Sequence, residues 1–538
     1  MGWFADALAR SMGNSLGMGP SPFRRTVETR DIPVPMRDGV HLLTDVHQPV
    51  GGEHLPVLLM RTPYGRRGAG GLIERATALR GFQVVSQSCR GTFGSQGTFR
   101  PFRDDARDGA DTLDWLESQD WFHGQLVLGG LSYYGWAAWA LAAAVDPSRI
   151  SAMVIQHAAT SVRPIFRPGG VLALSTLANW VYLQSIREGG AARAWWGSFR
   201  RRPRVARALG ESSPEHVDTA LTRGPVPFYQ EVLSAAEASD ALWSDSDHSA
   251  ALTLNAPPTH IMTAWFDFFL DAALADFATL TACGAEPRLT ISVGVHFPDA
   301  TSMKIEHPEM FAWYRAATNP SAPPPRATAV HLQLLGSKTW HDLAAWPPPA
   351  TPHALFLTAD GGLAKTPPQN TQHAQFTYTT TDPTPSVGGQ VMYDAGQLDN
   401  RILEQRPDVL TFTSAVHDDP LTVVGVAHLS IPVSTTAATT HLFVRLTDVA
   451  PDGRSLTLTD GITSTTNENA GSTAQLEIDL SATGFTIKPG HRLRLQVSSG
   501  AYPRYEAPLT AGTTTLELGP DSPAQLTLPV VAFAAAAD

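Results

Sequence analysis

The stretch QLVLGGLSYYG, from Gln125 to Gly135, decides the fold together with the Trp/Ala-rich segment WAAWALAAAV that follows it. An apolar run of strand length ends in two glycines, Leu131 and Ser132 follow, and Gly135 opens a segment that we expect to be a buried helix. Small residues permit a tight turn from strand to helix, with Ser132 at its tip and the backbone N–H of Tyr133 facing a developing oxyanion. The second glycine stands one position later than in the pattern G-x-S-x-G, and Tyr134 occupies its usual place. The stretch predicts a nucleophile elbow, although a glycine-serine turn beside a buried strand would show the same residues.

A serine hydroxyl becomes a nucleophile when a base takes its proton and an acid holds that base in the right tautomer. In hydrolases with a strand-turn-helix elbow, the acid and then the histidine follow the serine along the chain. The strand-like run THIMTA leads into Asp267, and the run RLTISVG leads into His296. Because open α/β sheets place their sites at the carboxyl ends of strands, we predict Asp267 as the acid and His296 as the base.

Other candidates lie farther from a strand end: Asp271 and Asp299 for the acid, and His307 for the base. Most of the 18 histidines are expected on the surface or satisfied in the core, among them His123, His157 and His260.

Two different sequence patterns follow one another along the chain. Up to about residue 320, short apolar runs alternate with helical segments, which is typical of buried parallel strands in an α/β sheet; these runs are 55–60, 81–87, 125–130, 151–156, 259–264 and 288–294. After the proline-rich stretches SAPPP and WPPPA, alternating strands rich in Thr and Ser predict a sandwich or jelly roll. We therefore predict an α/β core over 1–159 and 241–349, a helical insertion over 160–240, and an all-β domain over 350–538.

Composition and the absence of certain motifs exclude several classes of partner and cofactor. The 538 residues carry 39 Lys+Arg against 50 Asp+Glu, a net charge of −11 that argues against nucleic acid or an anionic membrane as partner. Two cysteines give neither a disulfide framework nor a metal knuckle, and no apolar stretch is long enough to cross a bilayer, so we expect a cytoplasmic protein. The chain contains no H-E-x-x-H, Cys-x-x-Cys, phosphate-loop or dinucleotide pattern, which predicts that no metal and no cofactor take part.

The chain also resembles the cocaine esterase and Xaa-Pro dipeptidyl-peptidase family of serine hydrolases over nearly its whole length. The segments that carry the resemblance are MRDGVHLLTDVHQP, RTPYGRRG, CRGTFGSQGTF, RDDARDGADTLDWLESQDWFHGQLVLGGLSYYGW, AWFDFF, VGVHFPD and PGHRLRLQVSSGAYPRY. It implies an α/β-hydrolase core, a helical cap inserted after the elbow, and a C-terminal jelly roll. It also implies Tyr64 as second oxyanion donor through its phenol, beside the N–H of Tyr133. The family's Gly-Pro-Trp-x-His is shortened here to Gly294-Val295-His296.

The resemblance places Trp180 and Phe269 in an apolar acyl pocket, with Ile165 in place of an aromatic residue. Each of these side chains is equally well a core residue of the cap.

The prediction is a serine hydrolase that cleaves small-molecule carboxylic esters of apolar or aryl acyl groups; a homodimer is left open. Xaa-Pro dipeptidyl-peptidase or α-amino-acid ester hydrolase activity is the alternative, which requires carboxylates for a free amino group, such as Asp271 or Asp276. A catalytically dead binding protein, with the jelly roll holding a carbohydrate or a partner, is the remaining reading.

Overall fold

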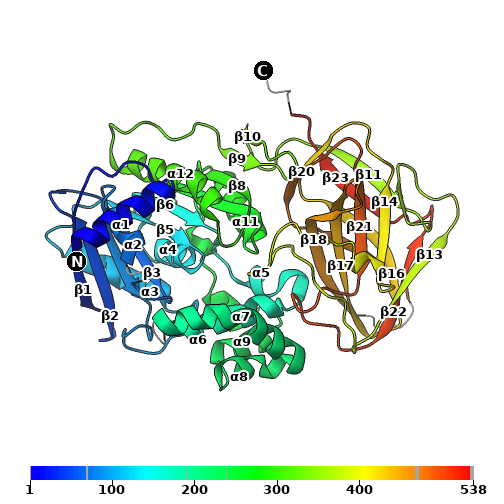
Figure 1. The fold of residues 1–538 in the computed structure, drawn as a ribbon, viewed down its shortest axis with the longest axis horizontal. Coiled ribbons are helices and arrows are strands. Elements are labelled where there is room, and N and C mark those ends of the chain that lie inside the picture. The colour runs from blue at the N-terminus through cyan, green and yellow to red at the C-terminus, as the bar shows by residue number, and fades with distance from the viewer. Residues whose placement is uncertain (1, 68–70, 189–190, 238, 467–471, 534–538) are drawn as a thin grey trace.

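The computed structural model describes residues 2–67, 71–188, 191–237, 239–466 and 472–533. Two large sheets organise these residues (Figure 1): one of ten strands in the N-terminal part and one of 13 strands in the C-terminal part. The described residues contain no helix that is both long enough and apolar enough to cross a membrane.

The first sheet is parallel at its centre. Its strands, in spatial order, are β1 (Thr26–Pro35), β2 (His41–Pro49), β4 (Gln83–Ser88), β3 (Val57–Thr62), β5 (Leu126–Leu131), β6 (Ala152–Gln156), β7 (Thr259–Phe266), β8 (Arg288–Val295), β9 (Val330–Gln333) and β10 (Trp340–Leu343). Strands β4, β3 and β5 to β9 pair in parallel, and antiparallel pairs close both ends. The six strands predicted from continuous apolar runs are β3 to β8, and their side chains are nearly all buried.

Helices cover both faces of this sheet; they are α1 (Gly2–Ser15), α2 (Leu72–Ala78), α3 (Asp105–Glu117), α4 (Tyr133–Ala144), α11 (Leu270–Ala282) and α12 (Ala300–Thr318). Side chains alternate along a strand, so neighbours enter different cores. Leu59 of β3 packs in the cluster of α3, α4 and α11, whereas the adjacent Leu58 packs in that of α1, α2 and α12. With the serine turn after β5, this is the arrangement of an α/β-hydrolase core.

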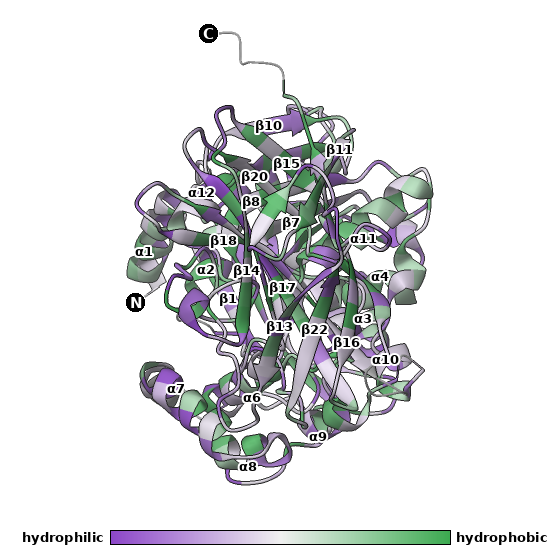
Figure 2. Cartoon of the chain, turned by 90° about the vertical axis from the view of Figure 1, so that its right-hand side faces the viewer, coloured by the Kyte–Doolittle hydropathy of each residue, from purple (hydrophilic) through white to green (hydrophobic). Residues whose placement is uncertain are grey.

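The chain between β6 and β7 is helical in the residues described and forms a lobe beside the sheet (Figure 1). Its helices are α5 (Arg163–Phe166), α6 (Leu174–Arg187), α7 (Ala191–Glu211), α8 (Val217–Thr222), α9 (Pro227–Ser234) and α10 (Ala241–Asp245). Apolar side chains of α6 and α9 form one cluster with the first turns of α4, so the lobe covers the elbow. In Figure 2, helix α7 lies at the outer side of this lobe and carries both purple, hydrophilic and green, hydrophobic residues.

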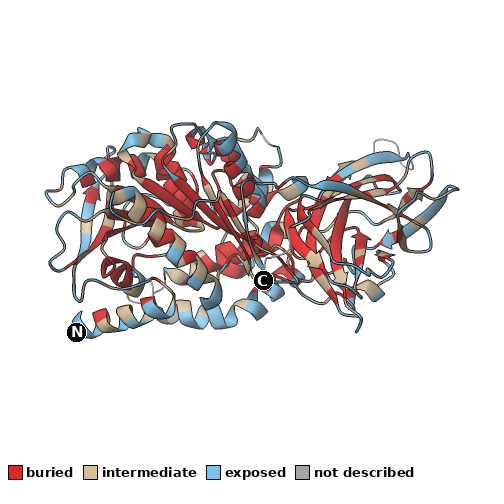
Figure 3. Ribbon diagram, turned by 90° about the horizontal axis from the view of Figure 1, so that it is seen from above, coloured by how far each residue is buried: buried red, intermediate tan, exposed pale blue. Residues whose placement is uncertain are grey.

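The C-terminal part is all-β. Its main path runs through β13 (Gln372–Tyr378), β22 (Gly512–Leu518), β16 (His428–Thr435), β23 (Gln525–Val530), β11 (Thr351–Leu357), β12 (Gly362–Ala364), β14 (Val409–Ser414), β21 (Arg492–Ser498), β17 (Thr439–Val449) and β18 (Ser455–Thr466); β15 (Leu421–Gly425), β19 (Ala474–Asp479) and β20 (Thr483–Ile487) pair beside it. The strands curl around a buried interior, visible in red in Figure 3, as in a jelly roll. The domain limits given above stay predictions.

A tight apolar junction joins the two parts. Leu335 donates its N–H to the carbonyl of Gly484 at 2.8 Å. A Cβ at Gly484 would lie 2.7 Å from Cζ2 of Trp265, so the absence of a side chain permits this approach. Because Trp265 precedes Asp267 by two residues, the all-β domain buttresses the end of the strand that carries the predicted acid.

Candidate active site

The turn after β5 holds Ser132 in a backbone conformation that few non-glycine residues adopt. Ser132 has φ 61° and ψ −123°, and it stands immediately before the first residue of α4. A Cβ at Gly130 would lie 2.7 Å from Cβ of Tyr134, and one at Gly135 would lie 2.8 Å from Cβ of Ala158. The displaced glycine therefore permits close packing of α4 against the chain after β6, and the turn has the geometry of a nucleophile elbow.

Ser132, His296 and Asp267 form a continuous hydrogen-bonded chain. Nε2 of His296 lies 3.0 Å from Oγ of Ser132, and Nδ1 of His296 lies 2.8 Å from Oδ1 of Asp267. His296 and Asp267 are both 0% exposed. Strand β8 extends to Val295, so His296 follows it directly and reaches the serine without the two residues that the resemblance expects before it. The structure thus brings together the three residues predicted from strand ends.

The alternative acids and base lie elsewhere. Asp299 caps helix α12 by accepting from the N–H groups of Thr301 and Ser302, and His307 contacts the carbonyl of Leu16 through Nδ1. Asp271 accepts from the N–H of Ala482 in the all-β domain. None of these contacts involves Ser132, so the structure does not join the three alternative residues to the elbow.

Burial and neighbouring charges oppose each other at Asp267. Burial raises the pKa of the Asp267 carboxyl, but the charges and hydrogen bonds of His157 and His296 outweigh burial and hold that pKa well below its ordinary value. For His296, burial dominates: it lowers the pKa of the imidazole, the nearby Asp267 opposes this, and His157 adds to the lowering. The acid is therefore ionised and the imidazole is neutral at neutral pH, which is the state a general base requires.

Tyr64 follows β3 (Val57–Thr62), and its hydroxyl lies beside the serine. Its hydroxyl accepts a hydrogen bond from Nε1 of Trp180 at 3.0 Å and lies near the Ser132 side chain. Burial raises the pKa of the Tyr64 phenol, so it keeps its proton. Tyr133 is the first residue of α4, where backbone N–H groups have no partner within the helix. Both predicted oxyanion donors thus stand next to Ser132.

The predicted acyl-pocket residues share one buried aromatic cluster with Tyr133 and the lobe. The ring of Phe269 stacks on His296, with centroids 5.5 Å apart. Trp180 contacts Tyr64 and borders a cavity of about 280 Å³ that is also lined by Phe99 and Phe228. Ile165 is buried in the same cluster but lines a different cavity, described next.

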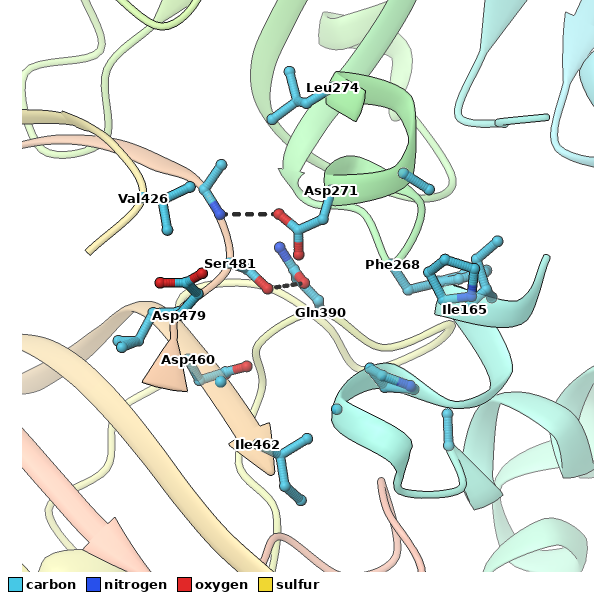
Figure 4. A pocket seen from close by; sticks show the side chains of 18 of the residues that line it. Ile165, Phe268, Asp271, Leu274, Gln390, Val426, Asp460, Ile462, Asp479 and Ser481 are labelled. Carbon is cyan, nitrogen blue, oxygen red and sulfur yellow. Dashed lines mark hydrogen bonds between the residues drawn. The ribbon is translucent and has the colours of Figure 1, made fainter. Parts of the chain in front are cut away.

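That second cavity, of about 430 Å³, lies between the lobe, α11 and the all-β domain (Figure 4). Polar groups of its lining bind one another: Asp271 accepts from the backbone N–H of Ala482, and the hydroxyl of Ser481 donates to the side chain of Gln390. Asp276 is also engaged, accepting from both the N–H and the hydroxyl of Thr160. Asp271 and Asp276 are the two acids considered for holding a free amino group. None of these contacts joins either acid to Ser132.

Four site residues were not singled out from the sequence. Phe268 lies 4.2 Å from His296 between ring centroids, and Phe297 lies 4.8 Å from it; both adjoin a predicted triad residue, which was the available signal. Tyr393 of the all-β domain packs on Phe297 at 5.3 Å and carries no local signal. His157 was expected in a satisfied core position; it is buried, but its Nδ1 lies 2.9 Å from Oδ2 of Asp267.

His157, Asp267 and His296 bring potential ligand atoms within 4.8 Å of one another, close enough for a metal ion. Each carboxylate oxygen of Asp267, however, already faces the Nδ1 atom of one of the two histidines. An ion would have to break both hydrogen bonds, so the arrangement suits proton transfer better than metal binding.

Two family models match the chain in succession. The model of X-Pro dipeptidyl-peptidase (S15 family) matches residues 38–298, and that of the X-Pro dipeptidyl-peptidase C-terminal non-catalytic domain matches residues 325–528. Among curated proteins, the cocaine esterase of Rhodococcus sp. (strain MB1 Bresler) is 28% identical, over 93% of this chain and 98% of that protein.

Solved structures share the fold over nearly the whole chain. An aminopeptidase from a marine sediment Thaumarchaeota archaeon superposes with a TM-score of 0.81 at 19% identity, covering 96% of this chain and 98% of that one. An α-amino acid ester hydrolase superposes with a TM-score of 0.79 at 20% identity, covering 94% and 97%. At these identities the likenesses show the fold.

Proposed function

Since this chain belongs to the cocaine esterase and X-Pro dipeptidyl-peptidase family of α/β-hydrolase serine hydrolases, we propose that it cleaves carboxylic esters of apolar or aryl acyl groups through an acyl-enzyme on Ser132. One observation carries the proposal: Ser132 Oγ stands 3.0 Å from Nε2 of His296, whose Nδ1 stands 2.8 Å from Asp267. A serine in a strained turn with an oriented, neutral imidazole beside it is the arrangement that acyl transfer requires.

The reaction begins when His296 takes the hydroxyl proton of Ser132 as the oxygen attacks the ester carbonyl. Asp267 keeps the imidazole in the correct tautomer and stabilises its charged form. The phenol of Tyr64 and the N–H of Tyr133 stabilise the tetrahedral oxyanion. His296 then gives its proton to the leaving alcohol, and a water activated by the same histidine hydrolyses the acyl-enzyme.

The preference for an apolar acyl group rests on the side chains around the elbow. Phe269 and Phe268 face His296, and Trp180 adjoins Tyr64, so the acyl group meets aromatic surface. Burying such a group is favourable by about 25 cal/mol per Å² of apolar surface. Ile165 shares the cluster and adds aliphatic surface to it.

One observation favours the alternative function, in which the enzyme recognises a substrate with a free α-amino group. Glu188, an exposed residue, borders the cavity beside Trp180, where a carboxylate can hold a free α-amino group. Such recognition is what an Xaa-Pro dipeptidyl-peptidase or an α-amino-acid ester hydrolase requires. The ester proposal is favoured because Asp271 and Asp276, the acids nearest to Asp267 in sequence, are engaged elsewhere.

The test is active-site labelling with a fluorophosphonate, read by intact mass and peptide mapping, alongside turnover of p-nitrophenyl acetate and p-nitrophenyl benzoate. We expect one adduct, on Ser132, and turnover of both esters. The Ser132→Ala variant should lose both, whereas Ser86→Ala, which removes a buried hydroxyl of β4, should keep both. A folded wild-type protein that neither labels nor turns over would overturn the proposal.

A second substrate pair separates the two branches. Alanyl-proline p-nitroanilide and a p-nitrophenyl ester of alanine present a free amino group, and p-nitrophenyl acetate does not. Faster turnover of the amino substrates, abolished in Glu188→Gln, would favour the alternative over the ester proposal.

A further inference from the structure

Four adjacent parallel strands each deliver one polar residue to the same place. Ser132 follows β5, His157 follows β6, Asp267 follows β7 and His296 follows β8, and these strands are neighbours in the sheet. The proposed mechanism uses three of the four residues. His157 is 0% exposed and stands at an equivalent strand end, so its position calls for a separate explanation.

The Asp267 carboxylate is held from two sides. Nδ1 of His296 lies 2.8 Å from Oδ1, and Nδ1 of His157 lies 2.9 Å from Oδ2. Phe269 donates its N–H to Oδ1, and Thr263 donates its hydroxyl to Oδ2. Each oxygen thus has two partners, and the carboxylate cannot rotate toward one histidine without losing contacts to the other.

Behind His157 lies a second carboxylate. Oε1 of Glu306, on helix α12, is 3.5 Å from Nε2 of His157, and Gln156 donates its amide N–H to Oε2 at 3.1 Å. Glu306 is 1% exposed. A buried carboxylate on a helix face costs free energy unless it is paired, and His157 is the cation in reach.

The backbone of His157 supports the same view. Its φ is 49°, in the left-handed region, and its N–H donates to the carbonyl of Met262 on the neighbouring strand at 2.8 Å. A left-handed backbone is strained for a non-glycine residue, and such conformations persist where the surroundings over-determine them. Here the conformation turns the imidazole between Asp267 and Glu306.

We propose that His157 and Glu306 are positioning residues of the active site: a buried imidazolium-carboxylate pair that fixes Asp267 opposite His296 while leaving the charge of Asp267 available to His296. The inference rests on the proposed function, because it assigns a role within the same catalytic chain.

Charge counting shows why a charged His157 needs Glu306 beside it. With His157 charged, the buried group of Glu306, His157 and Asp267 carries one net negative charge, and the proton that His296 gains during attack makes the whole cluster neutral. Without Glu306, the imidazolium of His157 would cancel the charge of Asp267, and the same proton would leave the cluster positive. A buried uncompensated charge is costly, so Glu306 offsets the opposition that the charge of His157 presents to proton uptake by His296.

The titratable groups that face His157 are Asp267, Glu306 and His296. Burial lowers the pKa of His157, but Asp267 and Glu306 outweigh it and raise the pKa to about 10, so His157 stays charged at neutral pH. The two imidazole rings are 6.0 Å apart, and the charge of His157 lowers the pKa of His296.

The experiment is the pH profile of kcat/KM for p-nitrophenyl acetate in three variants. His157→Asn keeps an N–H donor near the position of Nδ1 but removes the charge, and Glu306→Gln keeps the shape but removes the negative charge. His260→Asn is the matched control, because His260 is a buried histidine of β7 that contacts Thr290 instead of the site.

We expect His157→Asn to lower kcat/KM by about 10- to 100-fold, because Asp267 loses a charged partner that fixes its orientation toward His296. The midpoint of its acid limb should rise by about one pH unit, because a like charge near His296 is gone. Glu306→Gln should also lower kcat/KM but move the midpoint in the opposite direction, since the cluster becomes more positive. His260→Asn should leave kcat/KM within about twofold of wild type and the midpoint of the acid limb unchanged.

Unchanged midpoints in folded His157→Asn and Glu306→Gln proteins would overturn the inference, as would shifts of the same sign in both. Should His157→Asn not fold, the pH dependence of fluorophosphonate labelling in Glu306→Gln decides alone. Wild-type labelling on Ser132 is measured first: its failure would refute the proposed function, whereas normal labelling with unmoved profiles would refute this inference only.

Discussion

The molecule buries two clusters of charge, one in each of its large parts. In the α/β core, Asp267 lies between His157 and His296. In the all-β domain, Asp460 lies between Arg445 and Arg504, with nitrogen-oxygen distances of 2.9 Å and 2.8 Å. The two aspartates are equally inaccessible, at 0% and 2% exposed.

The clusters differ in their cations. Arginine keeps its proton at any pH a protein meets, so the charges around Asp460 are fixed. Histidine changes charge near neutral pH, so the cluster at Asp267 can gain or lose a proton. Arg445 also donates to Asn400 at 2.9 Å and to the carbonyl of Val387, which ties a loop to the sheet. Equal burial thus surrounds groups that can exchange a proton in one cluster and groups of fixed charge in the other.

The largest effect should come from Asp267→Asn. Asparagine removes the acceptor that fixes the tautomer of His296, so we expect kcat for p-nitrophenyl acetate to fall by about 10⁴-fold. The free energy of unfolding, measured by urea titration, shows whether the protein is intact. A loss of activity below about tenfold in the folded variant would contradict the catalytic reading of this cluster.

For Asp460→Asn we expect a loss of stability and no loss of activity. Removing this carboxylate leaves Arg445 and Arg504 buried without a counter-charge, which should cost about 3–5 kcal/mol of unfolding free energy. The remaining folded protein should keep kcat/KM within about twofold, measured per active site by fluorophosphonate titration. If activity fell as far as in Asp267→Asn, the distinction between the two clusters would fail.

Much of the site is local in sequence and could be predicted. Ser132 lies between glycines at the end of an apolar run, and Asp267 and His296 each follow a run of the same kind. Parallel strands bring such ends to one edge, so a short pattern implies a three-dimensional neighbourhood. The strands β3 to β8 were predicted for the same reason, since buried parallel strands read as continuous apolar runs.

The rest depends on contacts between distant segments. Glu306 sits within a helix, where a glutamate ordinarily faces solvent, and only the packing of α12 against β6 brings it to His157. Tyr393 reaches the site because the all-β domain docks on the core. His157 followed a predicted strand, as Asp267 did, but a single histidine at a strand end does not reveal its partner.

Tyr64→Phe tests a group that must hold one protonation state. The phenol keeps its proton because burial raises its pKa, so its removal takes away an oxyanion donor without changing the charge of the site. We expect kcat to fall by about 10²- to 10³-fold with little change in KM. Tyr378→Phe is the matched control, since that hydroxyl donates to Pro508 in the all-β domain. Equal kcat values for the two variants would exclude Tyr64 as a donor.

The smallest effect is a difference in how stability depends on pH. The pKa of His157 is raised from 6.5 to about 10 in the folded protein, so the stability that it contributes is fully present below pH 6.5 and is lost as the pH rises through about 10. Within that window the loss is about 1.4 kcal/mol per pH unit. We therefore expect the difference in unfolding free energy between wild type and His157→Asn to shrink by about this amount from pH ~7.5 to ~8.5. The difference between wild type and Asp460→Asn should stay constant over the same interval, because arginine does not titrate there. Parallel curves for both variants would mean that His157 carries no charge in the folded protein, and the two clusters would then be alike in holding fixed charge.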